Sequence, residues 1–353
     1  MKETLRNVQK EIRKHKLDAV LITHPPNMEY VLSAQNIDGN CFIGKNSFYF
    51  LTNFCFIGQA EKIVNTPWQI KLLKKGLVDT LAEICQKEHI KKLGVEENHI
   101  LLPFFNVLKT IKNIEIVLIQ DILEPLRIIK SKHEIAQIKK ACIKTTYIFK
   151  HILKSLSPGK TEKEVGFEID CFLKKEGDIA FETIVAGGPH SSFPHANKGS
   201  RKLKKGDAVI FDIGLRFNGY VSDFTRTIFI GKASRKQKEI YNIVLEAQKK
   251  AIAGIKQGVV CSSIDGIARK IISENGFGKF FGHGLGHGVG IEVHEKPYLS
   301  CQDNTVLKQN MVLTVEPGIY FKDDFGVRIE DTVLVMKNGC EVLTDFTKNL
   351  IEI

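Results

Sequence analysis

Two aspartates interrupt apolar strand patterns on either side of an Asn-Gly pair in the segment IFDIGLRFNGYVSDFTRT. Asn218 and Gly219 are typical of a two-residue hairpin turn, which places Asp212 opposite Thr225 on the neighbouring strand. Because side chains two residues apart share one face of a strand, Asp212 and Asp223 become diagonal neighbours within reach of a common cation. The alternative is a pair of solvent-facing carboxylates on an edge hairpin.

Two glutamates occur in similar settings nearer the end of the chain. Glu316 closes the apolar run of LTVEPGIY, and Glu330 interrupts the β-branched run of FGVRIEDTVLV. Strand alternation puts Arg328 on the same face as Glu330, where a guanidinium can orient carboxylates through hydrogen bonds. The alternative for each glutamate is a charge at a turn or at a sheet edge.

The stretch FGHGLGHGVGIEVHE, residues 281–295, adds imidazole to these carboxylates. Its glycine spacing fits neither the dinucleotide fingerprint nor the phosphate-binding loop of nucleotide-binding proteins. Glycine instead permits close approach of backbones, and imidazole offers a nitrogen ligand beside oxygen ligands. Two aspartates, one histidine and two glutamates therefore predict a site for two divalent ions that share bridging carboxylates.

The part of the chain that carries these residues repeats one order of elements. Capping boxes begin helices at Ser131, Thr161 and Ser234, and a shorter helix pattern at 262–275 follows the third. Strand patterns follow each pair of helices: KGDAVIFDIGLRF and YVSDFTRTIFIG after the first, then IEVHE, NMVLTVEP and GVRIEDTVLVM after the second. The order of helix, helix and sheet predicts two related α+β halves.

The first third of the chain alternates helix and strand patterns. Leu5, Val8 and Ile12 fall on one face of an expected helix at 3–16, and DAVLIT, KKLGVEE and NIEIVLIQ are typical of strands. This alternation indicates an α/β layer domain, in which we find no chemical constellation. We expect this smaller domain over 1–121 and the larger one over 127–353.

Composition excludes several classes of protein. No apolar run reaches the ~18 residues of a membrane span, and the charged N-terminus is unlike a secretory signal, so we expect a cytoplasmic protein without membrane contact. The eight cysteines occur singly, which disfavours a zinc ribbon. The net charge is +11, but the lysines are dispersed and nucleic-acid motifs are absent from the sequence, so we expect a solvated surface and no nucleic-acid partner.

Four motifs together resemble the pita-bread metallopeptidases, which include methionine aminopeptidase, aminopeptidase P and prolidase. These motifs are DIGLRFNGYVSDFTRT, HGLGHGVGIEVHE, TVEPGIY and GVRIEDT, and the resemblance covers residues 127–353. Residues 1–120 resemble the creatinase-type N-terminal domain of the proline-specific branch. The resemblance implies a pita-bread catalytic domain of α+β class, preceded in the sequence by a smaller α/β domain.

The resemblance also implies roles for individual side chains. The implied ligands of two metal ions are Asp212, Asp223, His287, Glu316 and Glu330. His195 is similar to a histidine that contacts substrate near the scissile bond, and His294 to one that stabilises the tetrahedral intermediate. His283 resembles a substrate-pocket histidine, for which a purely structural role is the alternative. Arg328 matches an arginine that supports the ligands, and His190 is expected to be a solvated loop residue.

The expected reaction is metal-assisted hydrolysis of the bond between an N-terminal residue and a following proline in peptides. Glu316 carries a proton from water to the leaving nitrogen, while His195 and His294 stabilise the carbonyl oxyanion. Ligand hardness favours Mn²⁺ over Zn²⁺, with Co²⁺ as a further alternative. The rival from another class is a non-catalytic binding relative, and the retention of all five ligands speaks against it.

Tyr298 is where the sequence departs from the family pattern. Many prolidases have an arginine directly after the HExP segment, where it can bind a substrate carboxylate, and tyrosine cannot form that ion pair. This departure favours an Xaa-Pro aminopeptidase that acts on longer peptides over an Xaa-Pro dipeptidase, which is the alternative. Dimers are common in the family, so we expect a homodimer.

Overall fold

The structure is a computed structural model that describes residues 2–353. Its contacts divide the chain into a first unit that ends at Arg127 and a second unit that begins at Ile128. The predicted domains, 1–121 and 127–353, are ranges expected to fold independently, and that expectation stays a prediction. In the described part of the chain, none of the helices is both long and apolar enough to cross a bilayer.

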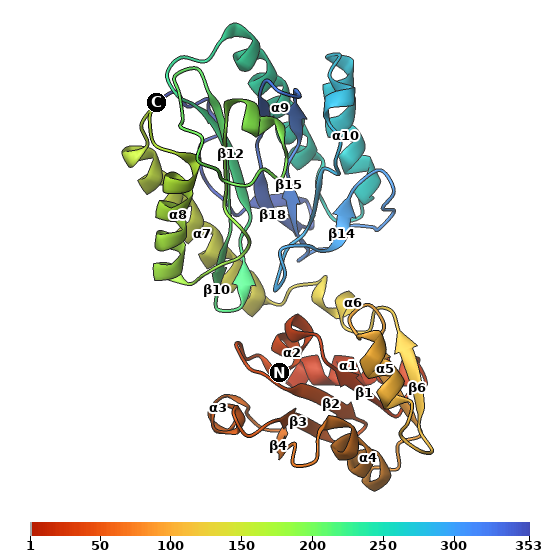
Figure 1. Ribbon diagram of the computed structural model, residues 1–353. Helices are drawn as coiled ribbons and strands as arrows, with labels where there is room; N and C mark the ends of the chain where they lie inside the picture. Colours follow the sequence, from red (N-terminus) through yellow and green to blue (C-terminus); the bar gives the residue numbers. More distant parts are fainter. Residues whose placement is uncertain (1) are drawn as a thin grey trace. The chain divides into compact units, whose positions relative to one another are not determined.

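A six-stranded mixed sheet with the strand order β4-β3-β2-β1-β5-β6 forms the centre of the first unit (Figure 1). The strands are β1 (Ala19–Ile22), β2 (Asn40–Gly44), β3 (Phe48–Thr52), β4 (Gln69–Leu72), β5 (Lys92–Glu96) and β6 (Glu115–Ile119). The helices are α1 (Lys2–Lys14), α2 (Pro25–Leu32), α3 (Ile57–Ile63), α4 (Leu77–Lys87), α5 (Leu102–Leu108) and α6 (Glu124–Arg127). As predicted, the apolar face of α1 is buried through Leu5, Val8 and Ile12.

The three predicted capping boxes all form in the second unit. The side chains of Ser131, Thr161 and Ser234 each accept a hydrogen bond from the backbone N–H of the residue three positions on. The side chain of that residue accepts in turn from the backbone N–H of the cap residue. The helices of this unit are α7 (Lys132–Ser155), α8 (Glu162–Glu176), α9 (Arg235–Gly254) and α10 (Cys261–Glu274). In Figure 1 the pairs α7–α8 and α9–α10 stand on opposite sides of strands β12, β15 and β18.

Four small sheets lie between these helix pairs. Their strand orders are β11-β10-β7, β12-β9-β8, β14-β13-β15-β18-β19 and β16-β17. The strands of the first half are β7 (Asp178–Ile179), β8 (Ile184–Gly187), β9 (Ala208–Ile213), β10 (Leu215–Phe217), β11 (Tyr220–Val221) and β12 (Phe224–Phe229). Those of the second half are β13 (Gly286–Gly288), β14 (Glu295–Leu299), β15 (Val312–Val315), β16 (Gly318–Tyr320), β17 (Gly326–Arg328), β18 (Asp331–Met336) and β19 (Gly339–Val342). Short 3-10 turns complete the unit at η1 (Gly188–Ser192) and η2 (Gly278–Phe280).

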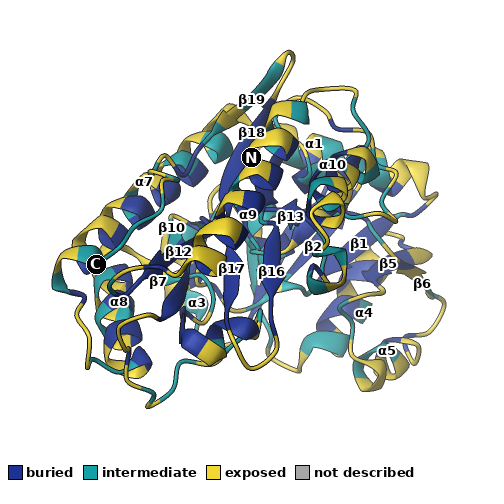
Figure 2. Cartoon of the chain, turned by 90° about the horizontal axis from the view of Figure 1, so that it is seen from above, coloured by how far each residue is buried: buried dark blue, intermediate teal, exposed yellow. Residues whose placement is uncertain are grey.

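The order of helix pair and sheet occurs twice, and each half buries its own apolar side chains. One cluster joins α7 and α8 to β8, β9 and β12, and another joins α9 and α10 to β14, β15 and β18. Figure 2 shows β16, β17 and β18 in the colour of buried residues, while α7 alternates between buried and exposed positions. These observations agree with the predicted α+β halves.

Two strand predictions in the second half differ from the structure. Residues 291–294 of the predicted strand IEVHE form bends, and β14 begins only at Glu295. The carboxylate of Glu295 accepts the N–H groups of Ile291 and Glu292, so it closes a turn that takes the place of the strand. The predicted strand at 326–336 is divided into β17 and β18, with Glu330 between them.

Candidate active site

The hairpin that carries the two aspartates has the predicted register. Phe217 pairs with Tyr220, and further along Asp212 pairs with Thr225. Asn218 and Gly219 both have positive φ, 48° and 82°, as a turn of type I′ requires. Asp223 lies in the interruption between β11 and β12 and is only 4% exposed, so the alternative of a solvent-facing pair is wrong for this residue.

Thr225 connects the hairpin to Glu330. Its hydroxyl donates to Oε2 of Glu330 over 2.6 Å and lies 3.3 Å from Nε of Arg328. Both Thr225 and Glu330 are buried. The sequence indicated the pairing of Thr225 with Asp212 but gave this hydroxyl no role, although its position two residues after Asp223 puts it on the same strand face.

His287 meets Glu316 beside the aspartates. Nε2 of His287 lies 3.3 Å from Oε1 of Glu316 and 3.7 Å from Oδ2 of Asp223. Nδ1 of the same ring lies 3.0 Å from the carbonyl of Gly288. A proton on Nδ1 satisfies that carbonyl, while Nε2 donates to Glu316 in the cation-free protein, where the pKa of His287 is raised. Loss of the Nε2 proton would turn its lone pair toward a bound cation, which is the tautomer that a ligand needs.

The glycines on both sides of His287 allow its strand to lie against its neighbours. A Cβ at Gly286 would lie 2.1 Å from the carbonyl oxygen of Thr314, and one at Gly288 would lie 2.4 Å from that of Lys296. Both distances are impossible for real atoms, so any side chain here would displace β13 and with it the imidazole of His287.

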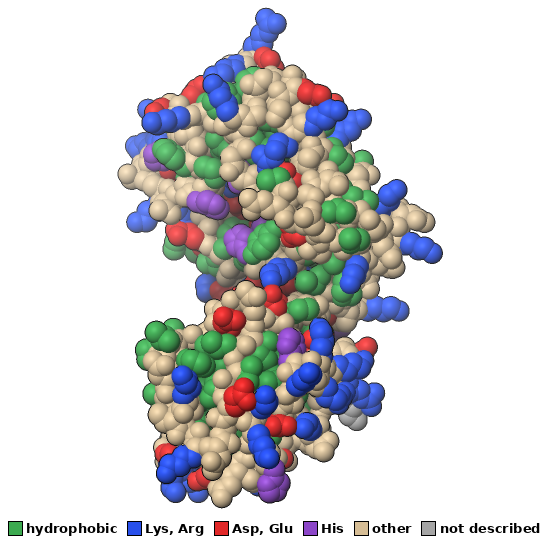
Figure 3. Space-filling model, turned by 90° about the vertical axis from the view of Figure 1, so that its right-hand side faces the viewer, with side chains coloured by type: hydrophobic (Ala, Val, Ile, Leu, Met, Phe, Trp, Pro, Cys, Tyr) green, Lys and Arg blue, Asp and Glu red, His purple; other side chains and the backbone are tan. Residues whose placement is uncertain are grey.

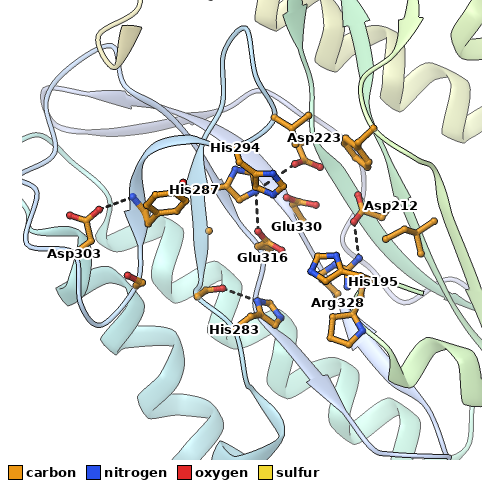
Figure 4. A pocket seen from close by; sticks show the side chains of 18 of the residues that line it. His195, Asp212, Asp223, His283, His287, His294, Asp303, Glu316, Arg328 and Glu330 are labelled. Atoms are coloured by element: carbon orange, nitrogen blue, oxygen red, sulfur yellow. Dashed lines mark hydrogen bonds and ion pairs between the residues drawn. The ribbon is translucent and has the colours of Figure 1, made fainter. Parts of the chain in front are cut away.

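The predicted ligands meet in one place (Figure 4). One ligand atom each from Asp223, His287 and Glu330 fall within 4.8 Å of one another. Glu316 joins this group through His287. Asp212 borders it with one oxygen bound to Arg328, while its buried Oδ1 accepts no hydrogen bond within residues 2–353.

The electrostatics of this cluster are those of a site short of positive charge. Burial raises the pKa of Asp223 and of Glu330 well above the usual values, and neighbouring carboxylates raise them further. For Glu316, burial acts in the same direction, but the bond from His287 and the positive charges of His287, His283 and Arg328 together outweigh it and lower the pKa to about 2. Divalent cations would compensate the repulsion and occupy the bare oxygen of Asp212, so the residues present fit the predicted metal ions.

A chain of hydrogen bonds connects Asp212 to His283. Arg328 binds Oδ2 of Asp212 over 2.7 Å and the hydroxyl of Tyr320 over 3.0 Å. That hydroxyl lies 3.1 Å from Nε2 of His283, whose Nδ1 bonds to the carbonyl of Gly284. Both ring nitrogens of His283 are therefore used within the protein, so it can offer a substrate only its ring surface. Tyr320 was missed, since nothing near it in the sequence shows that it faces Arg328.

His195 and His294 are the exposed members of the predicted set. In Figure 4 His294 lies above His287 on the side of Asp223, and His195 lies beside Arg328 on the side of Asp212. The rings of His287 and His294 are 4.3 Å apart between centroids. Burial and the nearby His287 lower the pKa of His294, which keeps it neutral and able to donate one hydrogen bond at neutral pH.

The site residues that the sequence predicted all line one cavity of about 1190 Å³. Tyr298 lines its outer part and is 44% exposed, with its backbone N–H bound to Asp303. Among the described lining residues, Arg328 is the only lysine or arginine, and it is already paired with Asp212. Figure 3 shows histidine and acidic side chains next to one another on this unit's surface.

Comparison with known proteins places this site in a family. Residues 136–337 match metallopeptidase family M24, and residues 5–129 match the creatinase/prolidase N-terminal domain. The chain belongs to family M24, in its proline-specific branch, and membership implies divalent metal ions. The chain is thus a metallopeptidase of the pita-bread class.

Its relatives match over nearly their whole length. An Xaa-Pro dipeptidase of Pyrococcus horikoshii is 40% identical over 99% of each chain. The structure of an Xaa-Pro dipeptidase from Bacillus anthracis aligns with a TM-score of 0.96 at 37% identity, over 99% of each chain. That of an X-Pro aminopeptidase from Thermotoga maritima aligns with a TM-score of 0.90 at 32% identity, over 98% of this chain and 100% of the other.

Proposed function

We propose that this metallopeptidase hydrolyses the bond between an N-terminal residue and a following proline, with Xaa-Pro dipeptides as the first substrate class. The observation that carries the hydrolysis is the gathering of four carboxylates and His287 in one cavity, with His195 and His294 at its sides. The choice of dipeptides rests on the relatives named Xaa-Pro dipeptidase. It reverses the sequence-based preference for longer peptides.

The proposed mechanism assigns one task to each group of side chains. Asp212, Asp223, His287, Glu316 and Glu330 would hold two divalent ions, which would supply a water of lowered pKa as the nucleophile. Glu316 is the proposed proton carrier, because its carboxylate lies in the cavity against His287 and within 3.4 Å of the Thr314 hydroxyl. Neutral His294 donates to the carbonyl oxygen as negative charge develops there, and His195 does so from the opposite side.

Proline recognition follows from what the substrate lacks. A bond before proline has no N–H, so a site for it needs no acceptor for that group. The ring surface of His283 then forms part of an apolar wall for the pyrrolidine ring, as both of its nitrogens are engaged. Arg328 keeps the carboxylate of Asp212 oriented.

Longer Xaa-Pro peptides are the second candidate substrate class. Tyr298 takes the place where many prolidases have arginine, and the described cavity lining holds no unpaired guanidinium or ammonium for a free proline carboxylate. The cavity of about 1190 Å³ also exceeds the roughly 300–1,000 Å³ that is usual for small-molecule sites. The Thermotoga relative is named X-Pro aminopeptidase, which agrees with this option.

A peptide-length series tests both candidates. The purified protein is assayed with Mn²⁺, Co²⁺ or Zn²⁺ on Xaa-Pro, Xaa-Pro-Xaa and Xaa-Ala peptides that share the first residue. We expect cleavage only before proline, with Mn²⁺ most active, and loss of activity with a chelator or in Asp223→Ala. A higher kcat/KM for tripeptides than for dipeptides would select the second candidate, and cleavage of Xaa-Ala at equal rates would end the proline assignment.

A further inference from the structure

One face of helix α8 is directed at the segment that carries His195. Glu162, Gly166 and Asp170 follow one another at intervals of four residues, so they line a single stripe of the helix. Each of the three meets residues in or beside the segment 187–199, which joins β8 to the turn before β9. Nothing in the proposed chemistry uses these helix residues.

Glu162 ties together the two ends of this segment. Its side chain is fully buried, with Oε1 accepting the N–H of Gly187 over 2.9 Å and Oε2 that of Gly199 over 3.1 Å. Nδ1 of His190 lies 3.0 Å from the same carboxylate, so this half-exposed histidine also has a partner in the protein. A buried carboxylate is costly unless such donors surround it, and the donors are thereby held in place.

The start of α8 adds backbone bonds at the same end of the segment. The N–H of Glu162 donates to the carbonyl of Arg201 over 3.0 Å, and that of Lys163 to Gly199 over 2.9 Å. These are N–H groups of the first helical turn, which have no partner within the helix. The segment therefore completes the helix end while the helix fixes the segment.

Asp170 and Gly166 hold the residue next to this anchor. Nζ of Lys198 lies 3.0 Å from Oδ2 of Asp170, whose other oxygen accepts the hydroxyl of Thr183 over 2.6 Å. The stem of Lys198 passes over Gly166, where an added Cβ would lie 2.5 Å from its Cδ. Lys198 is three residues after His195, so its position limits where the histidine can lie.

We propose that α8 acts as a clamp that sets the position of His195, with Glu162 as its principal positioning residue. His195 is itself exposed, and the carbonyl of the preceding Pro194 is held by Arg328 over 3.1 Å. Placement of the ring therefore depends on the anchors of its segment rather than on burial. The consequence for catalysis rests on the proposed function, since it requires His195 to contact the reacting carbonyl.

The first test compares Glu162→Gln with Glu164→Gln. Glutamine at 162 keeps the size of the side chain but presents an NH₂ group to a backbone N–H that needs an acceptor. We expect kcat on an Xaa-Pro peptide to fall at least tenfold with KM changed less than threefold and metal content unchanged. Glu164 caps the same helix from an exposed position, so its variant should keep kcat within twofold of the wild type.

A double-mutant cycle with His195→Ala identifies the route of the effect. If Glu162 acts through His195, then Glu162→Gln should lower kcat much less in the His195→Ala background than in the wild type. Equal fold-losses in both backgrounds would overturn the proposal, and so would an unchanged kcat in folded Glu162→Gln. Should that variant not fold, Asp170→Asn and Gly166→Ala make the same comparison, and unchanged kcat in both would reject the clamp.

Hydrogen exchange makes the test independent of the proposed function. Amides of residues 188–199 should exchange faster in Glu162→Gln than in Glu164→Gln, while those of β12 stay protected in both variants. Equal exchange in the two variants rejects the clamp, even for a protein that cleaves no proline peptide. Faster exchange in a protein without that activity supports the clamp and rejects only the proposed substrate.

Discussion

Arg328 holds one oxygen of the Asp212 carboxylate over 2.7 Å and leaves the other buried without a hydrogen bond from residues 2–353. The guanidinium thereby orients the carboxylate and neutralises part of its charge. Burial of a bare carboxylate oxygen opposes folding unless a cation occupies it. The pair therefore holds the carboxylate in one orientation and leaves one oxygen available, which fits the proposed role of Asp212 as a metal ligand.

Thr225→Val removes the hydroxyl that donates to Glu330. We expect metal affinity to fall about 10- to 100-fold, as is usual when a partner that orients a ligand is lost. The free energy of unfolding should fall by about 1–3 kcal/mol, because a buried carboxylate oxygen loses its donor. Metal titration by calorimetry and denaturant unfolding measure the two effects.

Thr227→Val is the matched control on the same strand. The hydroxyl of Thr227 is also buried, but it bonds to the backbone of Arg328 and not to a predicted ligand. The Thr227→Val variant should lose a comparable amount of stability, while its metal affinity should change by less than about threefold. A tenfold change corresponds to about 1.4 kcal/mol, so this is a small effect. Equal losses of affinity in both variants would contradict a specific role of Thr225.

Glu330→Gln should stabilise the metal-free protein while it removes activity. Burial and neighbouring carboxylates raise the pKa of Glu330, so its negative charge opposes folding when no cation is present. Neutral glutamine should therefore raise the free energy of unfolding of the chelated protein at pH 7. Thermal unfolding with and without chelator checks this, and a lower stability of the chelated variant would contradict it.

Tyr298→Arg should move substrate choice toward dipeptides. A guanidinium in the outer part of the cavity can bind the free carboxylate of an Xaa-Pro dipeptide with two hydrogen bonds. We expect the ratio of kcat/KM for Xaa-Pro over Xaa-Pro-Xaa to rise about tenfold, equivalent to about 1.4 kcal/mol. Tyr298→Phe, which adds no charge, should leave this ratio within twofold, and a similar shift in both variants would count against the explanation.

The contacts of Glu352 should stabilise the folded protein at neutral pH and be lost in acid. Bonds from Lys232, Lys238 and the N–H of Ala233 lower its pKa from 4.5 to about 2. Because the pKa is lower in the folded state, its contribution is present above pH 4.5 and is lost as pH falls toward 2. The difference in Tm between wild type and Glu352→Gln should shrink over that range and at high salt, and parallel Tm curves would exclude this contribution.

The predictable parts of this structure are those encoded by neighbouring residues. An Asn-Gly turn fixes the register of its strands, so the pairing of Asp212 with Thr225 follows from the sequence alone. A capping box likewise contains both of its partners within four residues, and all three boxes form. The family relation is confirmed, while the roles of the individual site residues stay predictions.

The parts that were missed depend on contacts distant in the sequence. Glu162 meets Gly187 and Gly199 across 25 and 37 residues, and Thr225 meets Glu330 across 105. The predicted strand is wrong at residues 291–294 because the Glu295 carboxylate accepts the backbone N–H groups of Ile291 and Glu292, which alternating apolar residues cannot reveal. Apolar patterning reports which side chains are buried, but not which buried polar groups meet.

The glycines beside His287 also constrain how this enzyme can change over generations. Any replacement at Gly286 or Gly288 meets the backbone of a neighbouring strand, so no compensating side-chain change nearby can make room. Gly282, in the same glycine-rich stretch, has open space where a Cβ would lie, so other residues can replace it without a clash. A selection for new substrate preference should therefore accumulate mutations at Gly282 and Tyr298 while His287 and its two neighbours remain invariant.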